Sequence, residues 1–246
     1  MDTGKVINLI SNNFQHSILY EDKDIIIIDK AVNVIVHGKI GQQGMLLEDV
    51  RKYLTMRLGS KPIFLAPSNR LDRNTCGPVV FSKNKSTALR LRKLFTQCRV
   101  QKIYRARLIG ELKKPLFVQA DIIRGNHKKA RVDNIQILTD HFPDKLSWFT
   151  DRTENSRTIS ATVIKPLEIS HGSTMAEIYP WTGRYHQIRA ICHAIGFPIS
   201  GDQKYNKKQW KKNRKKQPEQ WITQALQCKY LSIEAFNISV ESRFNL

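Results

Sequence analysis

The sequence predicts an α+β protein folded as a single domain over residues 1–246. Some segments alternate apolar and polar residues or are apolar throughout, as strands are, and others place apolar residues at helical spacing. The two kinds follow one another without the regular strand, helix, strand order of a parallel fold, and no internal repeat of fixed period is present. A chain of 246 residues can bury a substantial core within one domain.

Three segments have the pattern of strands. Residues 24–30, DIIIIDK, place four consecutive isoleucines between acids, which is typical of a short strand buried on both faces. Residues 102–110, KIYRARLIG, alternate apolar side chains with arginines, so we expect one face to be buried. Residues 174–183 alternate similarly and end in a turn that contains Pro180 and Gly183.

Two segments have the pattern of helices. Residues 85–98, KSTALRLRKLFTQC, place apolar side chains on one side and basic side chains elsewhere. Residues 185–196, YHQIRAICHAIG, carry a stripe of isoleucines, and Gly196 is a natural C-terminal stop. The predicted buried sides consist of Ala88, Leu91, Leu94, Phe95 and Cys98 in the first helix, and of Ile188, Ile191 and Ile195 in the second.

The charge of the chain indicates the class of partner. Lys and Arg number 41 against 21 Asp and Glu, which gives a net charge of +20 and a pI near 10.0. Such an excess repels itself unless a polyanion offsets it. No apolar run approaches the length of a membrane span, and the N-terminus lacks the pattern of a targeting segment. We therefore expect a cytoplasmic protein that binds nucleic acid and no membrane.

The charge is most concentrated in residues 204–217, KYNKKQWKKNRKKQ, which carry eight basic residues and no acid. Such a run is either a solvated surface or a contact for RNA phosphates, and the sequence leaves both open. Residues 1–17, before the first expected strand, are interpreted as an N-terminal extension.

Metal ligands are not indicated. The four cysteines, Cys76, Cys98, Cys192 and Cys228, form no C-x-x-C pair, and the seven histidines form no H-E-x-x-H motif. We therefore expect no metal site.

One acid stands out in the segment NRLDRNTCG, residues 69–77. Asp72 lies between Arg70 and Arg73 in a chain with few acids. Taken alone, it is either a structural ion pair that holds a loop or a catalytic carboxylate held ready by arginines.

Three separated segments together resemble the RluA-type pseudouridine synthases. Residues 69–84 match an R-L-D-x-x-T-[ST]-G box, residues 102–112 match a K-x-Y-x-A strand, and residues 182–205 match T-G-R-x-H-Q-[IL]-R followed by G-x-P-[IL]-x-G-D-x-x-Y. Residues 18–38 look like the family's first strands, and residues 225–233 look like its closing strand. The resemblance implies a single catalytic domain on a mixed, largely antiparallel sheet flanked by helices and loops.

The resemblance also implies an isomerase that converts a uridine of tRNA or rRNA to pseudouridine by base flipping. Such an enzyme needs no cofactor, because reactant and product contain the same atoms. Asp72 occupies the catalytic position, Arg189 matches the arginine that pairs with it, and Tyr104 matches the tyrosine that contacts the target base. Arg70 matches an arginine that enters the RNA stack in some relatives. Further RNA contacts are expected at Arg73, Lys83, Arg184, Lys204, Lys211 and Lys212.

Three departures from the family pattern accompany these matches. Asn69 stands where His is frequent, Cys76 stands where Ser is frequent, and neither Pro nor Gly follows Lys30 as they often do. We also expect no N-terminal RNA-binding domain of the S4 type, no obligate protein partner, and a monomer. A non-catalytic RNA-binding or RNA-folding protein on the same scaffold is the alternative.

Overall fold

The computed structural model describes residues 16–38, 44–59, 64–125, 129–140, 142–143, 158–207, 211 and 223–246. The fold is α+β, as predicted, and the strand pairings within each of its two units are antiparallel. The chain forms two compact units, one of Met1–Gln101 with Gln227–Asn245 and one of Lys102–Leu226 with Leu246.

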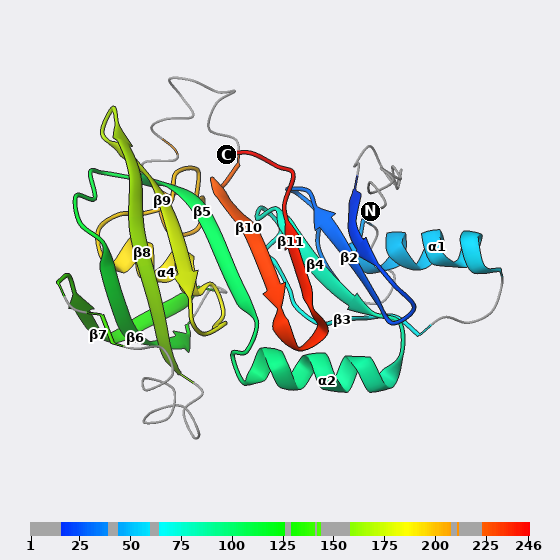
Figure 1. The fold of residues 1–246 in the computed structure, drawn as a ribbon. Helices are drawn as coiled ribbons and strands as arrows, with labels where there is room; N and C mark the ends of the chain where they lie inside the picture. The colour runs from blue at the N-terminus through cyan, green and yellow to red at the C-terminus, as the bar shows by residue number, and fades with distance from the viewer. Residues whose placement is uncertain are drawn as a thin grey trace. The chain divides into compact units, whose positions relative to one another are not determined.

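The first unit contains a four-stranded antiparallel sheet in the order β1-β2-β4-β3, together with a hairpin of β10 and β11 (Figure 1). Strand β2 is buried along its whole length, which confirms the strand expected at residues 24–30. The bounds are β1 Ser17–Glu21, β2 Ile25–Lys30, β3 Ala66–Pro67, β4 Gly77–Ser82, β10 Leu226–Ile233 and β11 Ile238–Glu241, with a 3-10 turn, η2, at Glu234–Phe236.

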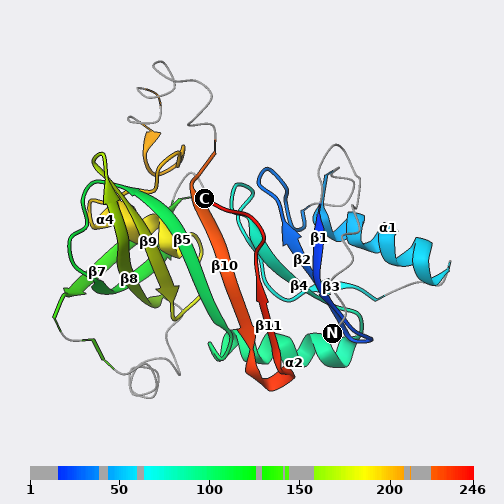
Figure 2. The same cartoon turned by 45° about the horizontal axis from the view of Figure 1, so that its top comes forward.

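Two helices belong to the first unit. Helix α1 spans Leu46–Leu58, and helix α2 spans Lys85–Thr96, within the range expected for the first helix. The Asn84 side chain caps α2 by accepting a hydrogen bond from the Thr87 amide at 2.8 Å. Leu91 and Leu94 of α2 pack into a core with residues of β2, β4, β10 and β11, and α2 lies beside the β10–β11 turn (Figures 1 and 2).

The second unit contains strands in the order β5-β9-β8-β6-β7 and the helix α4. Helix α4, Gln187–Ala194, contacts β6, β7 and β9, and the strands curve around it (Figure 1). Its Ile188 and Ile191 are buried in a core shared with Ala106, Leu108 and Ile178 of the neighbouring strands. The strands are β5 Gln101–Ile109, β6 Leu116–Arg124, β7 Ala130–Leu138, β8 Ile159–Ser170 and β9 Ser173–Pro180. The expected alternation at residues 102–110 and 174–183 is thus confirmed in β5 and β9.

Candidate active-site residues

The segment that carries Asp72 is anchored to β4 at its start. The Asn69 side-chain oxygen accepts a hydrogen bond from the Val80 amide at 2.8 Å, and its nitrogen donates to the Pro78 carbonyl at 3.1 Å. An amide side chain can do both at once, because it carries a donor and an acceptor. The departure at Asn69 therefore supplies a fixed entry to the loop.

The same segment is anchored to β10 at its end. Gly77 has a φ of +126°, and a Cβ atom there would lie 2.3 Å from the Cys228 carbonyl oxygen. The Cys228 amide donates to the Cys76 carbonyl at 2.9 Å. Only glycine permits this close approach of two backbones at a positive φ.

Asp72 lies between these anchors and is partly exposed. The Thr75 amide donates to the Asp72 carbonyl at 3.0 Å, which closes a tight turn, while Leu71 is buried beneath the loop. Arg70 and Arg73 are exposed on either side. The Arg73 Nε donates to the Asn33 carbonyl at 3.3 Å.

A fully buried lysine supports this turn from below. The Lys30 Nζ donates to the carbonyls of Ala31 at 2.9 Å, Val34 at 3.0 Å and Arg73 at 3.2 Å. Burial lowers the pKa of Lys30 to about 8, while the charge of Asp72, and that of Cys76 once its thiol is deprotonated, act to raise it. Lys30 therefore joins residues 31–34 to the loop and lies within electrostatic reach of Asp72. The sequence shows Lys30 only as the last residue of the expected strand, after Asp29, and assigns it no role.

Cys76 is a buried thiol in the same loop. Burial, followed by the charge of Asp29, raises the pKa of Cys76 to about 11, although Lys30 acts in the opposite direction. The thiol is therefore neutral near pH 7 and is a poor nucleophile. The replacement of the frequent serine by Cys76 keeps a small, buried side chain at this point.

In the second unit, Tyr104 lies on β5 opposite Ile178 of β9. Its ring is partly buried and packs against the core of this unit. Two residues earlier on the same strand, the Lys102 Nζ donates to the Thr182 carbonyl at 3.4 Å. Lys102 and Tyr104 of the K-x-Y motif thus lie on a strand that is tied directly to the T-G-R turn.

One buried amide organises the turn before α4. The Gln187 side-chain oxygen accepts from the Thr182 hydroxyl at 2.8 Å and the Arg184 amide at 2.9 Å. Its nitrogen donates to the Ala161 carbonyl at 3.0 Å and the Thr162 hydroxyl at 2.9 Å. These four bonds fix the turn to β8, which explains why the motif carries a glutamine at this position. No role was predicted for Gln187 from the sequence.

Arg189 of α4 forms a buried two-point ion pair with Asp202. Its Nε donates to Asp202 Oδ2 at 2.7 Å and its Nη2 donates to Oδ1 at 2.9 Å. Burial acts to raise the pKa of Asp202, but the hydrogen bonds and charge of Arg189, with the amides of Tyr205 and Lys204, lower it overall. Asp202 belongs to the G-D-x-x-Y motif, although the sequence alone assigned it no function. The pairing of Arg189 with Asp72 would join residues of the two units and stays a prediction.

The residues predicted to contact RNA have different surroundings. Arg70, Arg73 and Lys211 are exposed, and Arg184 and Lys204 are partly exposed. The Arg184 Nε donates to the Ile159 carbonyl at 2.9 Å. Lys212 lies outside the described residues, as do most of residues 1–17 and of the basic stretch 204–217. Their roles in RNA binding stay predictions.

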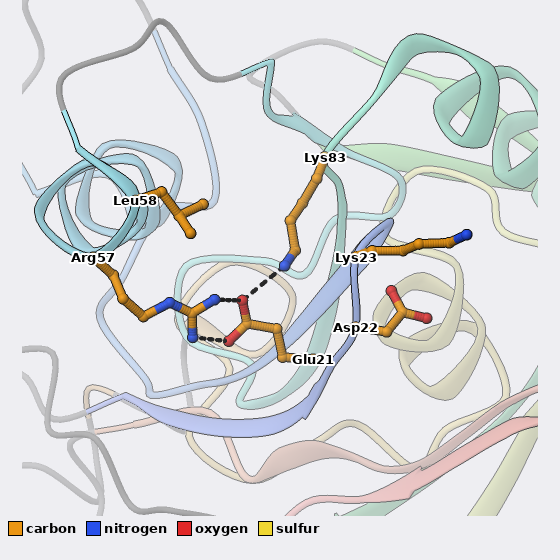
Figure 3. A pocket seen from close by; sticks show the side chains of 6 residues that line it. All are labelled: Glu21, Asp22, Lys23, Arg57, Leu58 and Lys83. Atoms are coloured by element: carbon orange, nitrogen blue, oxygen red, sulfur yellow. Dashed lines mark hydrogen bonds and ion pairs between the residues drawn. The ribbon is translucent and has the colours of Figure 1, made fainter.

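Lys83 lines a pocket of the first unit with a volume of about 570 Å³ (Figure 3). Its Nζ lies 2.7 Å from Glu21 Oε1, and Arg57 binds both oxygens of the same carboxylate. Burial acts to raise the pKa of Glu21, but the hydrogen bonds and charges of Arg57 and Lys83 outweigh it and lower this pKa. The ammonium of Lys83 is therefore engaged by a protein carboxylate, and its predicted contact with an RNA phosphate gains no support from this position.

The described residues contain neither a metal-binding cluster nor a membrane-spanning helix. In the described ranges, no group of three or more His, Cys, Asp or Glu side chains is placed to hold a metal ion. None of the helices in the same part of the chain is both long and apolar enough to cross a membrane.

Comparison with known proteins identifies the family. Residues 24–194 match the sequence model described as RNA pseudouridylate synthase. The chain belongs to this family. The match contains Asp72, Tyr104 and Arg189, whereas Asp202 lies beyond it. The predicted RluA type is confirmed by this match together with the curated relatives of the family.

Relatives and a solved structure of the family agree with this assignment. The chain is 27% identical over 208 residues to a mitochondrial pseudouridylate synthase of Rattus norvegicus, covering 81% of this chain and 54% of the rat protein. It is 28% identical over 191 residues to ribosomal large subunit pseudouridine synthase C of Vibrio parahaemolyticus, covering 78% of this chain and 53% of that protein. The chain thus spans about half the length of these relatives.

The fold also agrees with a solved family member. The structure of human RNA pseudouridylate synthase domain containing 4 superposes with a TM-score of 0.69, covering 93% of this chain and 88% of the human one. The two are 22% identical in sequence, so this likeness supports the fold alone.

Proposed function

We propose that this protein is an RNA pseudouridine synthase that isomerises a specific uridine by an Asp72-dependent, cofactor-free mechanism. The observation that carries the proposal is the R-L-D-x-x-T loop of a family member, fixed by Asn69 at one end and by Gly77 against Cys228 at the other. Such a rigid loop holds a carboxylate in one direction, which catalysis requires of its reacting groups.

The reaction breaks the bond between uracil N1 and ribose C1′ and joins C5 to C1′. The hydrogen on C5 leaves as a proton and N1 takes up a proton, so the composition is unchanged. We propose that Asp72 either attacks C1′ directly or removes a ribose proton to give a glycal. Both routes require an ionised carboxylate.

Three other side chains complete the proposed site. Arg189 pairs with Asp72 and keeps it aimed, and Tyr104 contacts the target base and assists removal of the C5 proton. Arg70 replaces the stacking that the RNA loses when the uridine turns out of the helix. Asp202 then acts through Arg189, because its two-point pair fixes the direction of the guanidinium.

The proposed substrate is ribosomal RNA, with transfer RNA as the other candidate. The name of the Vibrio relative refers to the large ribosomal subunit, and the net charge of +20 suits a polyanionic substrate. Exposed Arg73 and Lys211, with Arg184 and Lys204, are proposed to hold phosphates. The cytoplasm remains the proposed compartment.

Release of tritium tests the activity. RNA from cells that lack the protein, labelled with tritium at uridine C5, is expected to release label with the wild type and none with Asp72→Asn, which should still bind the RNA. Glu48→Gln, which removes the same charge at an exposed ion pair of α1, is the matched control and should release label as the wild type does. Full release by Asp72→Asn would remove Asp72 from the mechanism. No release by the wild type would favour the RNA-binding alternative.

A further inference from the structure

An exposed aromatic stack lies at the start of α4 in the second unit. Tyr185 is 37% exposed as a residue, and its ring stacks on the His186 ring, with centroids 3.9 Å apart and planes inclined by 19°. The guanidinium carbon of Arg124, at the end of β6, lies 5.1 Å from the Tyr185 centroid. The T-G-R-x-H-Q pattern leaves position 185 unspecified, so the motif itself gives this tyrosine no role.

The stack is held from behind by a buried tyrosine. The Tyr205 hydroxyl accepts from the Ala130 amide at 2.7 Å and lies 3.0 Å from His186 Nδ1. A hydroxyl can accept a second hydrogen bond or donate its own hydrogen, so the tautomer of His186 decides the direction of this contact, and either direction ties the imidazole to Tyr205. The Tyr205 amide in turn donates to Asp202 Oδ1 at 3.1 Å, which connects the stack to the Arg189 ion pair.

The backbone at His186 is also constrained. His186 has a φ of +53°, in the left-handed region that residues with a Cβ rarely adopt. Its bond to Tyr205 and its stack on Tyr185 offset this strain. Because His186 is fixed by these contacts, the Tyr185 ring that stacks on it is held in a defined position.

Exposed cations surround the stack. Arg124 covers part of the Tyr185 ring, and the exposed Lys129, beside the start of β7, lies 5.9 Å from the Tyr205 centroid. Aromatic faces with neighbouring basic side chains are how proteins bind single-stranded nucleic acid.

We propose that Tyr185, supported by His186, is a stacking site for an unpaired base of the RNA substrate. Stacking of a base on an aromatic ring outweighs an exposed cation–π contact, so the base takes the place of the Arg124 guanidinium. Arg124 and Lys129 then contact the adjacent phosphates. The inference rests on the proposed function, because it assumes that RNA is the substrate.

Fluorescence of a base analogue tests this site without any catalysis. The probe is a set of single-stranded RNAs of about 12 nucleotides, each with 2-aminopurine at a different position. Stacking on a tyrosine quenches this base, so the wild type is expected to quench it at one or two positions. Tyr185→Ala should lose this quenching and bind about tenfold more weakly, whereas Tyr185→Phe should keep the quenching.

Two controls separate stacking from other effects. Phe64→Ala removes a ring that is also 37% exposed, in the first unit, and should leave quenching and affinity unchanged. Arg124→Gln and Lys129→Gln should keep the quenching, and each should reduce the slope of binding against salt by about one. Matching thermal unfolding of Tyr185→Ala and Tyr185→Phe shows that the loss concerns the ring and not the fold.

The outcomes for the site and for the activity are distinguishable. Quenching and affinity that survive Tyr185→Ala would overturn the stacking site even if the wild type releases tritium from uridine C5. Quenching that depends on Tyr185 would support the site even if no RNA releases tritium, in which case the proposed isomerase activity alone would fail.

Discussion

The guanidinium of Arg189 and the carboxylate of Asp202 meet at two points, at 2.7 Å and 2.9 Å, in the interior of the second unit. The Asp202 side chain is 1% exposed and that of Arg189 is 10% exposed. A buried pair of this kind adds little net stability over an apolar pair, but the loss of one partner leaves the other charge uncompensated.

Asp202→Asn is therefore expected to lower the free energy of unfolding by about 3 kcal/mol. Because the pKa of Asp202 is lowered on folding, the deficit is fully present above its ordinary pKa of 3.8 and shrinks as the pH falls through the lower folded value. Urea unfolding of the wild type and the variant at several pH values measures this stability deficit. The control is Asp133→Asn, which breaks the exposed pair with Arg131 and should cost less than about 1 kcal/mol. Equal losses in the two variants would show that Asp202 has no special structural role.

The lowered pKa of Lys30 predicts that the protein becomes more stable in mildly alkaline solution. Folding lowers its pKa from 10.5 to about 8, so between these values the unfolded chain holds a proton that the folded chain has released. The free energy of unfolding therefore rises with pH across this window, by about 3 kcal/mol for this group alone.

The measurement compares the wild type with Lys30→Met. The variant does not titrate at this position, so the stability of the wild type relative to the variant should increase from pH 8 to pH 10. A difference in stability between the two proteins that does not change with pH would show that Lys30 stays protonated in the folded protein. At pH 7 the variant should also release less tritium from uridine C5 if the proposed function holds, since the carbonyl of Arg73 in the loop that carries Asp72 loses a donor.

Gly77 offers a test of the backbone contact that closes the loop carrying Asp72. A methyl group at this position would overlap the Cys228 carbonyl in addition to requiring a φ of +126°. We expect Gly77→Ala to lower the free energy of unfolding by about 3 to 4 kcal/mol.

Gly172→Ala is the matched control, because its φ is +70° and a Cβ atom there meets nothing within 4 Å. It should cost only the backbone strain, about 1 kcal/mol. Thermal or urea unfolding of both variants gives the comparison. If Gly77→Ala were as stable as Gly172→Ala, the loop and β10 would not be in close contact.

The strands and helices with a strong local pattern could be predicted from the sequence. The four isoleucines of β2 are buried as expected, and α2 and α4 lie within their predicted ranges. Such patterns depend on residues close together in the chain, so a single segment contains the information.

The partners of buried polar groups could not be predicted, because they come from distant segments. Lys83 stays a predicted RNA contact, and the ion pair of its ammonium with Glu21 of β1 joins segments about 60 residues apart in the chain. Gln187 and Asp202 belong to family motifs, but the sequence assigns them no role. Gln187 bonds to β8 and Asp202 bonds to Arg189, and both sets of bonds exist only in the folded chain. The pairing of Asp72 with Arg189 and the contact of Tyr104 with a base rest on family motifs and stay predictions.

The contact between Cys76 and Cys228 has a consequence for synthesis on the ribosome. The first unit combines Met1–Gln101 with Gln227–Asn245, so its two parts are translated before and after the whole of the second unit. The loop that carries Asp72 therefore lacks one of its two anchors until Cys228 has left the exit tunnel. A nascent chain that stops short of this point holds the motifs at residues 69–84, 102–112 and 182–205 but lacks the backbone contact that closes the loop around Asp72.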